Sequence, residues 1–187
     1  MGLLRPGARA VRPVRGRRAD PSPLRQRGVL RRAAAVSTVR IRQAREQDAA
    51  AVADLVQEVY RPFATGFSPT ALRWSAATVR ACASSWLLAH REEELVGVVH
   101  HEPDPEGHTL DALSVRVPWR RHGVGSQLVA AVEELAATRI RGTCRMVVAL
   151  RDTLSANIEF FTSLGYRQTQ PFPPAHHLYV KEIGARQ

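Results

Sequence analysis

The segment that most constrains the fold is residues 113–126, LSVRVPWRRHGVGS, in which a predicted strand leads through a turn into a helix. Gly123 and Gly125 mark the start of that helix. The first N–H groups of a helix lack intrahelical partners, and the helix dipole favours negative charge there. Glycine lets the backbone approach an anion closely, and Arg120 and Arg121 add charged donors. The segment therefore predicts a pyrophosphate-binding turn.

Two other phosphate-binding motifs do not match this turn. A P-loop requires a Gly-Lys pair after its first glycine, and the chain contains no such pair. The dinucleotide fingerprint requires a third glycine, but Leu128 occupies that position. Neither an ATPase-type nor a dinucleotide-type site is indicated.

Apolar periodicity predicts seven strands and four helices along the chain. Hairpin strands come first, and strands that alternate with helices follow. This order predicts an α/β fold with a mixed sheet and helices on both faces. Strands are expected at residues 39–43, 85–90, 95–101, 109–117, 145–150, 166–169 and 177–183, and helices after a cap at Asp48 and at 70–83, 123–137 and 154–164.

The net charge of +10 is concentrated in one part of the chain. Residues 1–35 hold ten arginines and one aspartate, whereas the remainder holds 17 basic and 16 acidic side chains. The rest of the chain is thus nearly neutral, which disfavours nucleic-acid binding. No apolar run reaches the roughly 18–20 residues that span a bilayer, so no membrane partner is expected. Two cysteines without zinc spacing indicate a reducing cytoplasm, and the single lysine among many arginines indicates a GC-rich bacterial gene.

Residues 1–35 have no apolar periodicity, and their density of like charge predicts a disordered tail. Three explanations of this tail stay open. In the first, the start codon is assigned too far upstream and Val36 is a candidate native start. In the second, the tail is an organelle transit peptide. In the third, it is a polybasic arm that binds nucleic acid or anionic lipid. Residues 36–187 are expected to form the single folded domain.

Arg120-x-x-Gly123-x-Gly125 resembles the signature of the GNAT superfamily of acyl-CoA-dependent N-acetyltransferases. Further segments match the family in the same order along the chain, and the resemblance covers residues 37–184. They are Ile41 to Asp48 at the first strand, Leu95-Val-Gly97 after the hairpin turn, Leu113-Ser-Val115 before the glycine turn, and Phe160-Phe-Thr-Ser-Leu-Gly-Tyr166.

The resemblance implies one GNAT-like α/β domain whose mixed, mostly antiparallel sheet splays apart between the fourth and fifth strands. It also implies acetyl-CoA as co-substrate, bound in that gap. The amide of Val115 would stabilise the oxyanion, and Val117 would pair with the pantetheine arm. The residues that the resemblance assigns to the coenzyme are Val115, Val117, Arg120, Arg121, His122, Gly123, Val124, Gly125, Ser126, Asn157 and Phe161.

The sequence departs from the family pattern on the predicted helix at 154–164. The tyrosine that often protonates the thiolate aligns with Phe161, which has no proton to give. Tyr166, beyond the glycine, is the alternative catalytic acid, with a core aromatic as the competing interpretation. The asparagine that often contacts the coenzyme aligns with Leu154. Asn157, one turn later, is the candidate replacement, with a solvent-facing asparagine as the competing interpretation.

Candidates for the general base and the acceptor site lie on the predicted strands and the loop after the first helix. Asp111 is the first candidate for the base, and His100 or His101 is the second. The loop at residues 60–70 is aromatic and carries one cation, which could hold a carboxylate; a lid packed for stability is the alternative. The predicted acceptor-binding residues are Tyr60, Arg61, Phe63 and His100.

Four functions stay open from the sequence. The leading one is acetylation of a small primary amine by direct attack on acetyl-CoA. Acetylation of a protein N-terminus or lysine, a non-catalytic acyl-CoA-binding module, and nucleic-acid binding through the tail are the others. His176 and His177 have no further ligands at metal spacing, so no metal is expected. A homodimer is common in the family and is left open.

Overall fold

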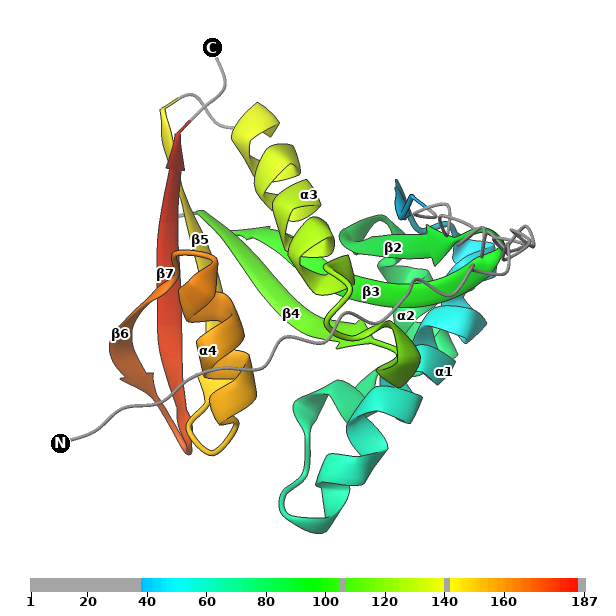
Figure 1. Ribbon diagram of the computed structural model, residues 1–187, viewed down its shortest axis with the longest axis horizontal. Helices are drawn as coiled ribbons and strands as arrows, with labels where there is room; N and C mark the ends of the chain where they lie inside the picture. Colours follow the sequence, from blue (N-terminus) through cyan, green and yellow to red (C-terminus); the bar gives the residue numbers. More distant parts are fainter. Residues whose placement is uncertain (1–37, 105–106, 140–141, 185–187) are drawn as a thin grey trace, which may run out of the picture. The chain divides into compact units, whose positions relative to one another are not determined.

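Seven strands form a sheet in the computed structural model, which describes residues 38–104, 107–139 and 142–184 (Figure 1). The strand order is β1-β2-β3-β4-β5-β7-β6. Neighbouring strands are antiparallel except β4 and β5, which are parallel. The strands are β1 (Arg40–Gln43), β2 (Trp86–Arg91), β3 (Glu94–Asp104), β4 (Gly107–Val115), β5 (Thr143–Arg151), β6 (Arg167–Phe172) and β7 (His176–Gly184).

Helices cover both faces of this sheet (Figure 1). On one face, Val56 of the first helix is buried with Leu88 and Val98. On the other, Leu128 of the third helix and Phe161 of the fourth belong to a second buried cluster. The predicted α/β class, with its mixed sheet between helices, is confirmed. The helices are α1 (Ala49–Tyr60), α2 (Ala76–Ala81), α3 (Val124–Arg139) and α4 (Ser155–Ser163).

The parallel strands β4 and β5 separate partway along their length. Their pairing ends at Leu110 and Val148, although β4 continues to Val115 and β5 to Arg151. A bulge in β4 accompanies the separation, because Ala112 has a φ angle of 48° and the register with β3 shifts beside it. The predicted splay between the fourth and fifth strands is therefore confirmed.

The second predicted helix is shorter than expected. Instead of one helix over residues 70–83, a 3-10 helix at Thr70–Arg73 precedes α2. Trp74 has an extended backbone that interrupts the helix, and Ser75 caps α2 by accepting a hydrogen bond from the N–H of Thr78 (3.2 Å). The periodicity of the apolar residues did not reveal this break, because a tryptophan continues an apolar pattern without continuing the helix.

Asp48 occupies the predicted N-cap position of α1 but makes no capping hydrogen bond to it. Its carboxylate accepts two hydrogen bonds from Arg42 (2.7 and 2.8 Å) and one from the N–H of Arg45 (2.7 Å). These bonds, above all those from Arg42, lower the pKa of Asp48 to about 2. Asp48 thus joins β1 to the start of the helix, and the prediction of a side-chain cap was wrong.

The predicted tail at residues 1–35 lies outside the described residues, so its interpretation stays a prediction. Within the described residues, none of the helices has both the length and the apolar character needed to cross a bilayer.

Candidate active site

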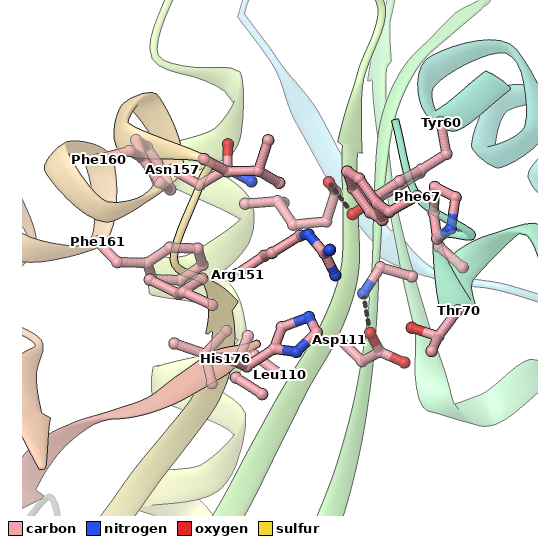
Figure 2. Close-up of a pocket in the computed structure, with 18 of the residues that line it drawn as sticks. Tyr60, Phe67, Thr70, Leu110, Asp111, Arg151, Asn157, Phe160, Phe161 and His176 are labelled. Atoms are coloured by element: carbon pink, nitrogen blue, oxygen red, sulfur yellow. Dashed lines mark hydrogen bonds between the residues drawn. The ribbon is translucent and has the colours of Figure 1, made fainter. Parts of the chain in front are cut away.

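A cavity of about 140 Å³ lies where β4 and β5 part (Figure 2). Its walls come from the two strands, from α4, from the segment after α1 and from the start of β7. A larger cavity of about 600 Å³ lies beside it and shares four of its lining residues. The shared residues are Thr70, Leu110, Asp111 and Ala149.

The backbone of β4 turns polar groups toward the gap. Arg116 donates its N–H to the carbonyl of Val96 on β3 (3.0 Å), so the alternation of a strand directs the N–H and C=O of Val115 away from β3. The carbonyl of Val115 accepts from Nε of Arg120 (3.1 Å), and the carbonyl of Leu113 accepts from the Tyr60 hydroxyl (3.4 Å). The amides of Leu113 and Val115 consequently face the side where β5 has moved away.

The glycine turn has the backbone geometry that an anion site requires. Arg121 and Gly123 have φ angles of 63° and 77°, in the region that favours glycine. Gln127 donates to the carbonyl of Gly123 (3.0 Å), so the N–H groups of Gly125 and Ser126 precede the first intrahelical bond of α3. N–H groups at this position in a helix are the ones that can bind an anion, and the role of this turn stays a prediction.

Close packing ties the glycine turn to α4. A Cβ atom at Gly125 would lie 3.3 Å from a ring atom of Phe160, closer than an ordinary side-chain contact. The basic residues predicted to bind phosphate, Arg120, Arg121 and His122, are exposed, and Nδ1 of His122 lies 2.8 Å from the carbonyl of Arg120. The turn therefore presents exposed cations beside a helix start that reaches the edge of the gap.

The sequence profile of the acetyltransferase (GNAT) family matches residues 49–166 of this chain. The chain belongs to the GNAT acetyltransferase family. It is accordingly an acyltransferase, and acetyl-CoA is the co-substrate of the family. A comparison with curated proteins finds no significant match.

Solved structures of N-acetyltransferases share the GNAT fold. PaiA N-acetyltransferase from Thermoplasma acidophilum, in complex with coenzyme A, has a TM-score of 0.69 at 13% identity over 78% of this chain and 99% of that one. N-acetylglutamate synthase from Neisseria gonorrhoeae, with coenzyme A and L-arginine, has a TM-score of 0.61 at 19% identity over 79% and 34%. The ribosomal-protein-S18-alanine N-acetyltransferase from Escherichia coli has a TM-score of 0.60 at 15% identity over 80% and 96%.

In this GNAT domain, the rings of Phe161 and Tyr166 pack against each other with centroids 5.3 Å apart, but the two residues differ in their access to the smaller cavity. Asn157 and Phe161 line the smaller cavity, together with Leu154. Tyr166 is completely buried outside that lining, and its hydroxyl donates to Glu133 of α3 (3.1 Å). Burial, and then the charge of Glu133, raise the pKa of Tyr166. The structure brings Asn157 and Phe161 to the gap and leaves the Tyr166 hydroxyl in the packing between α3 and the sheet.

The structure places the two candidate bases differently on the acceptor face. Asp111 has an exposed side chain that lines both cavities, and its Oδ1 accepts from the N–H of Ala112 (2.7 Å). His100 is buried, with its ring centroid 4.5 Å from that of Trp74 and 5.0 Å from that of Trp86. Burial lowers the pKa of His100, so its ring is neutral near pH 7. Among the residues that line the two cavities, Asp111 is present and His100 is not.

His101 points to the opposite face, as strand alternation requires. Its Nδ1 atom lies 3.0 Å from Nε2 of His108, and both rings are buried. Burial, followed by the neighbouring charges of His108, His100 and Arg139, lowers the pKa of His101 to about 4. Neither histidine belongs to the lining of the two cavities.

Of the acceptor-binding residues predicted at the end of α1 and in the loop after it, Tyr60 lines the smaller cavity, whereas Arg61 and Phe63 do not. Tyr60 lines it, and burial together with the charge of Asp111 raises the pKa of Tyr60, so its hydroxyl stays protonated at neutral pH. Arg61 is exposed and lies outside the lining. Phe63 packs between Tyr60 and Phe67, with ring centroids 6.3 and 6.4 Å away.

Arg151 and His176 line the smaller cavity, and neither was predicted as a site residue. Arg151 ends β5 beside the gap, and His176 is its partner in the register with β7. The cavity therefore carries a guanidinium from the sheet, where the sequence had indicated Arg61 from the loop. An arginine that follows a buried strand was the available signal, but only the topology shows that this strand borders the gap.

Proposed function

We propose that this GNAT acetyltransferase transfers the acetyl group of acetyl-CoA to a primary amine of a small molecule by direct attack. The observation that carries the proposal is the gap beside β4, where the amide of Val115 faces away from β3 and Leu113 lines a cavity of about 140 Å³. The adjoining cavity of about 600 Å³, which shares Asp111 with it, falls within the roughly 300–1,000 Å³ of pockets for small ligands. A small acceptor matches it better than a folded protein surface does.

The coenzyme is assigned to the α3 side of the gap. The pyrophosphate rests on the amides at the start of α3, including Gly123, Val124, Gly125 and Ser126, with Arg120, Arg121 and His122 as charged neighbours. The pantetheine arm runs from the exposed Val117, which begins a 3-10 helix just after β4, along β4 toward Asn157 and Phe161. The complexes of structural relatives with coenzyme A support coenzyme binding by a domain of this fold.

The reaction needs an oxyanion donor, a base and a route for the leaving thiolate's proton. The amine nitrogen bonds to the carbonyl carbon, the carbon–sulfur bond breaks, and coenzyme A leaves as the thiolate. An amide of β4, at Val115 or at Leu113, donates to the developing oxyanion, which by analogy with oxyanion holes contributes about 3 kcal/mol. Asp111 accepts the ammonium proton, directly or through water.

The proton for the thiolate comes from Tyr60 or from solvent in this scheme. Tyr60 has a protonated hydroxyl at the cavity, whereas the hydroxyl of Tyr166 is held by Glu133 away from it. Both cysteines are free thiols, in keeping with the cytoplasm of a bacterium as the proposed location.

The first experiment is calorimetry of the full chain with acetyl-CoA, followed by thiol release with a pooled library of primary amines. Binding and turnover with a small amine are the expected results. Turnover only with peptide N-termini would replace the small acceptor by a protein. Coenzyme binding without turnover on either set would point to a non-catalytic module. The absence of coenzyme binding would end the proposal.

A further inference from the structure

The guanidinium of Arg151 is held in position at the cavity, and among the described residues no ion pair joins it to a carboxylate. Its Cζ atom lies 3.9 Å from the ring centroid of Phe67, a cation–π contact that fixes the plane of the group. Its Nε atom is buried and has no hydrogen-bond partner among the described residues. Figure 2 shows the guanidinium pointing into the cavity, between Phe67 and His176.

His176 on β7, the strand paired with β5, also has a buried side-chain nitrogen without a partner among the described residues. It is the register partner of Arg151, and its Nδ1 atom is likewise buried without a partner in the described part of the chain. Burial, and then the charge of Arg151, lower the pKa of His176, so the ring is neutral and can donate one N–H. A buried donor without an acceptor costs about 1–3 kcal/mol. Arg151 can only donate, so its guanidinium needs an acceptor, which a ligand in the cavity can bring.

A negative charge, that of Asp111, lies across the same cavity from the guanidinium of Arg151. Asp111 is the carboxylate in the lining of this cavity, and Arg151 is the guanidinium. The two come from neighbouring strands at the point where β4 and β5 have stopped pairing. A ligand with one positive and one negative group would match both walls, and a simple amine would leave Arg151 unsatisfied.

We infer that the acceptor is a primary amine that also carries a carboxylate, such as an amino acid. This inference rests on the proposed function. The carboxylate binds the fork of Arg151 and accepts from His176, while the amine lies toward Asp111 and the gap. Arg151 is thus a specificity-determining residue for the acceptor.

The contacts of Arg151 favour the acceptor over the coenzyme as the source of the anion. It packs against Phe67, in the segment after α1, and pairs with the start of β7. The exposed cations at the start of α3, Arg120 and Arg121, belong to a different part of the gap. The coenzyme phosphates therefore have their own donors.

The test measures thiol release by the full chain with matched acceptors. L-Alanine, L-glutamate, β-alanine and 4-aminobutyrate are each compared with the corresponding carboxamide. At least one carboxylate is expected to exceed its amide by about 100-fold in kcat/KM, the size of a charge-assisted pair. Arg151→Met should bring that ratio close to one, and Arg151→Lys should give an intermediate ratio. The exposed Arg167→Met, on β6, is the control and should keep the wild-type ratio.

Four results would overturn the inference. The first is that carboxylates and amides react alike with the wild type. The second is that Arg151→Met keeps the preference for carboxylates, and the third is that Arg61→Met removes this preference instead. The fourth is that Arg151→Met raises the Kd of acetyl-CoA, which would assign the guanidinium to the coenzyme. In each case turnover of neutral amines leaves the proposed function standing. If the wild-type chain binds no acetyl-CoA, the proposed function itself fails. Circular dichroism of each variant separates these results from loss of the fold.

Discussion

The Nδ1 atom of His101 on β3 lies 3.0 Å from the Nε2 atom of His108 on β4, and both side chains are buried under α3. One ring must donate and the other accept, so protonation of the pair removes its hydrogen bond. The folded-state pKa of His101 is about 4, below its usual value of 6.5, and that of His108 is lowered as well. The unfolded chain therefore binds protons at a higher pH than the folded chain does.

Stability should accordingly be full above about pH 6.5 and fall as the pH drops toward 4. For His101 alone the loss is on the order of 2 kcal/mol by pH 5. His101→Asn keeps a polar atom near His108 without titrating, so its unfolding free energy should depend less steeply on pH. Denaturant unfolding at pH 8, 6 and 5 measures this slope, with the exposed His122→Asn as control. If the unfolding free energy of wild type and of His101→Asn depends equally on pH, the histidine pair is not the cause of the acid sensitivity.

Gly123→Glu should weaken acetyl-CoA binding by about 100-fold or more. The φ angle of 77° at this position strains any side chain by roughly 1–2 kcal/mol, and the new carboxylate would repel the phosphates at the start of α3. Ala130→Glu adds the same charge to the exposed surface of α3 and should bind like the wild type. Calorimetry measures the affinity of the wild type, Gly123→Glu and Ala130→Glu for acetyl-CoA. Equal affinities of all three would mean that the pyrophosphate binds elsewhere.

Asp111→Asn should lower kcat/KM for the acceptor by about 100-fold at pH 7, a typical loss for a general base, and leave the Kd of acetyl-CoA unchanged. The deficit should shrink at high pH, because a growing fraction of the amine is then already deprotonated. Glu102→Gln removes a nearby charge on β3 that lies outside both cavity linings, so it serves as the matched control. A deficit that is the same from pH 6 to 9 would assign Asp111 to binding instead of proton transfer.

The sequence predicted the fold well because its signals are local. Strand alternation, the helical apolar stripe of α1 and the glycine turn before α3 all depend on neighbours in the chain. The break between Trp74 and Ser75 escaped prediction because the apolar pattern continues through it. The loop cation was placed at Arg61 because the loop is contiguous in sequence.

The structure instead brings Arg151 into the smaller cavity beside Phe67 and His176. These three residues are far apart in the chain and meet only through the order of the strands. Without that order, an arginine at the end of a strand is indistinguishable from a surface residue. The acceptor site was therefore harder to predict than the coenzyme turn, which is built from one continuous segment.

Tyr166→Phe tests whether a tyrosine just after the family's glycine acts as the acid. Its hydroxyl donates to Glu133, which Lys181 also holds (2.7 and 2.9 Å), so removing the hydroxyl should cost about 1 kcal/mol of stability. Because this network lies outside the cavity lining, kcat should not change. Tyr179→Phe removes a similar bond, to Gln168 (3.1 Å), and controls for the loss of stability.

The informative counterpart is Tyr60→Phe, because the Tyr60 hydroxyl is at the cavity and hydrogen-bonds to Leu113. Its loss should lower kcat at least about tenfold if this hydroxyl protonates the thiolate, since positioned acids commonly contribute 100-fold or more. Stopped-flow thiol release separates this chemical step from product release. A decrease in Tyr166→Phe with none in Tyr60→Phe would return the acid role to Tyr166 and require α4 to move when the coenzyme binds. If kcat decreases in neither variant, solvent is the proton source. Solvent can serve because the thiolate of coenzyme A is a good leaving group.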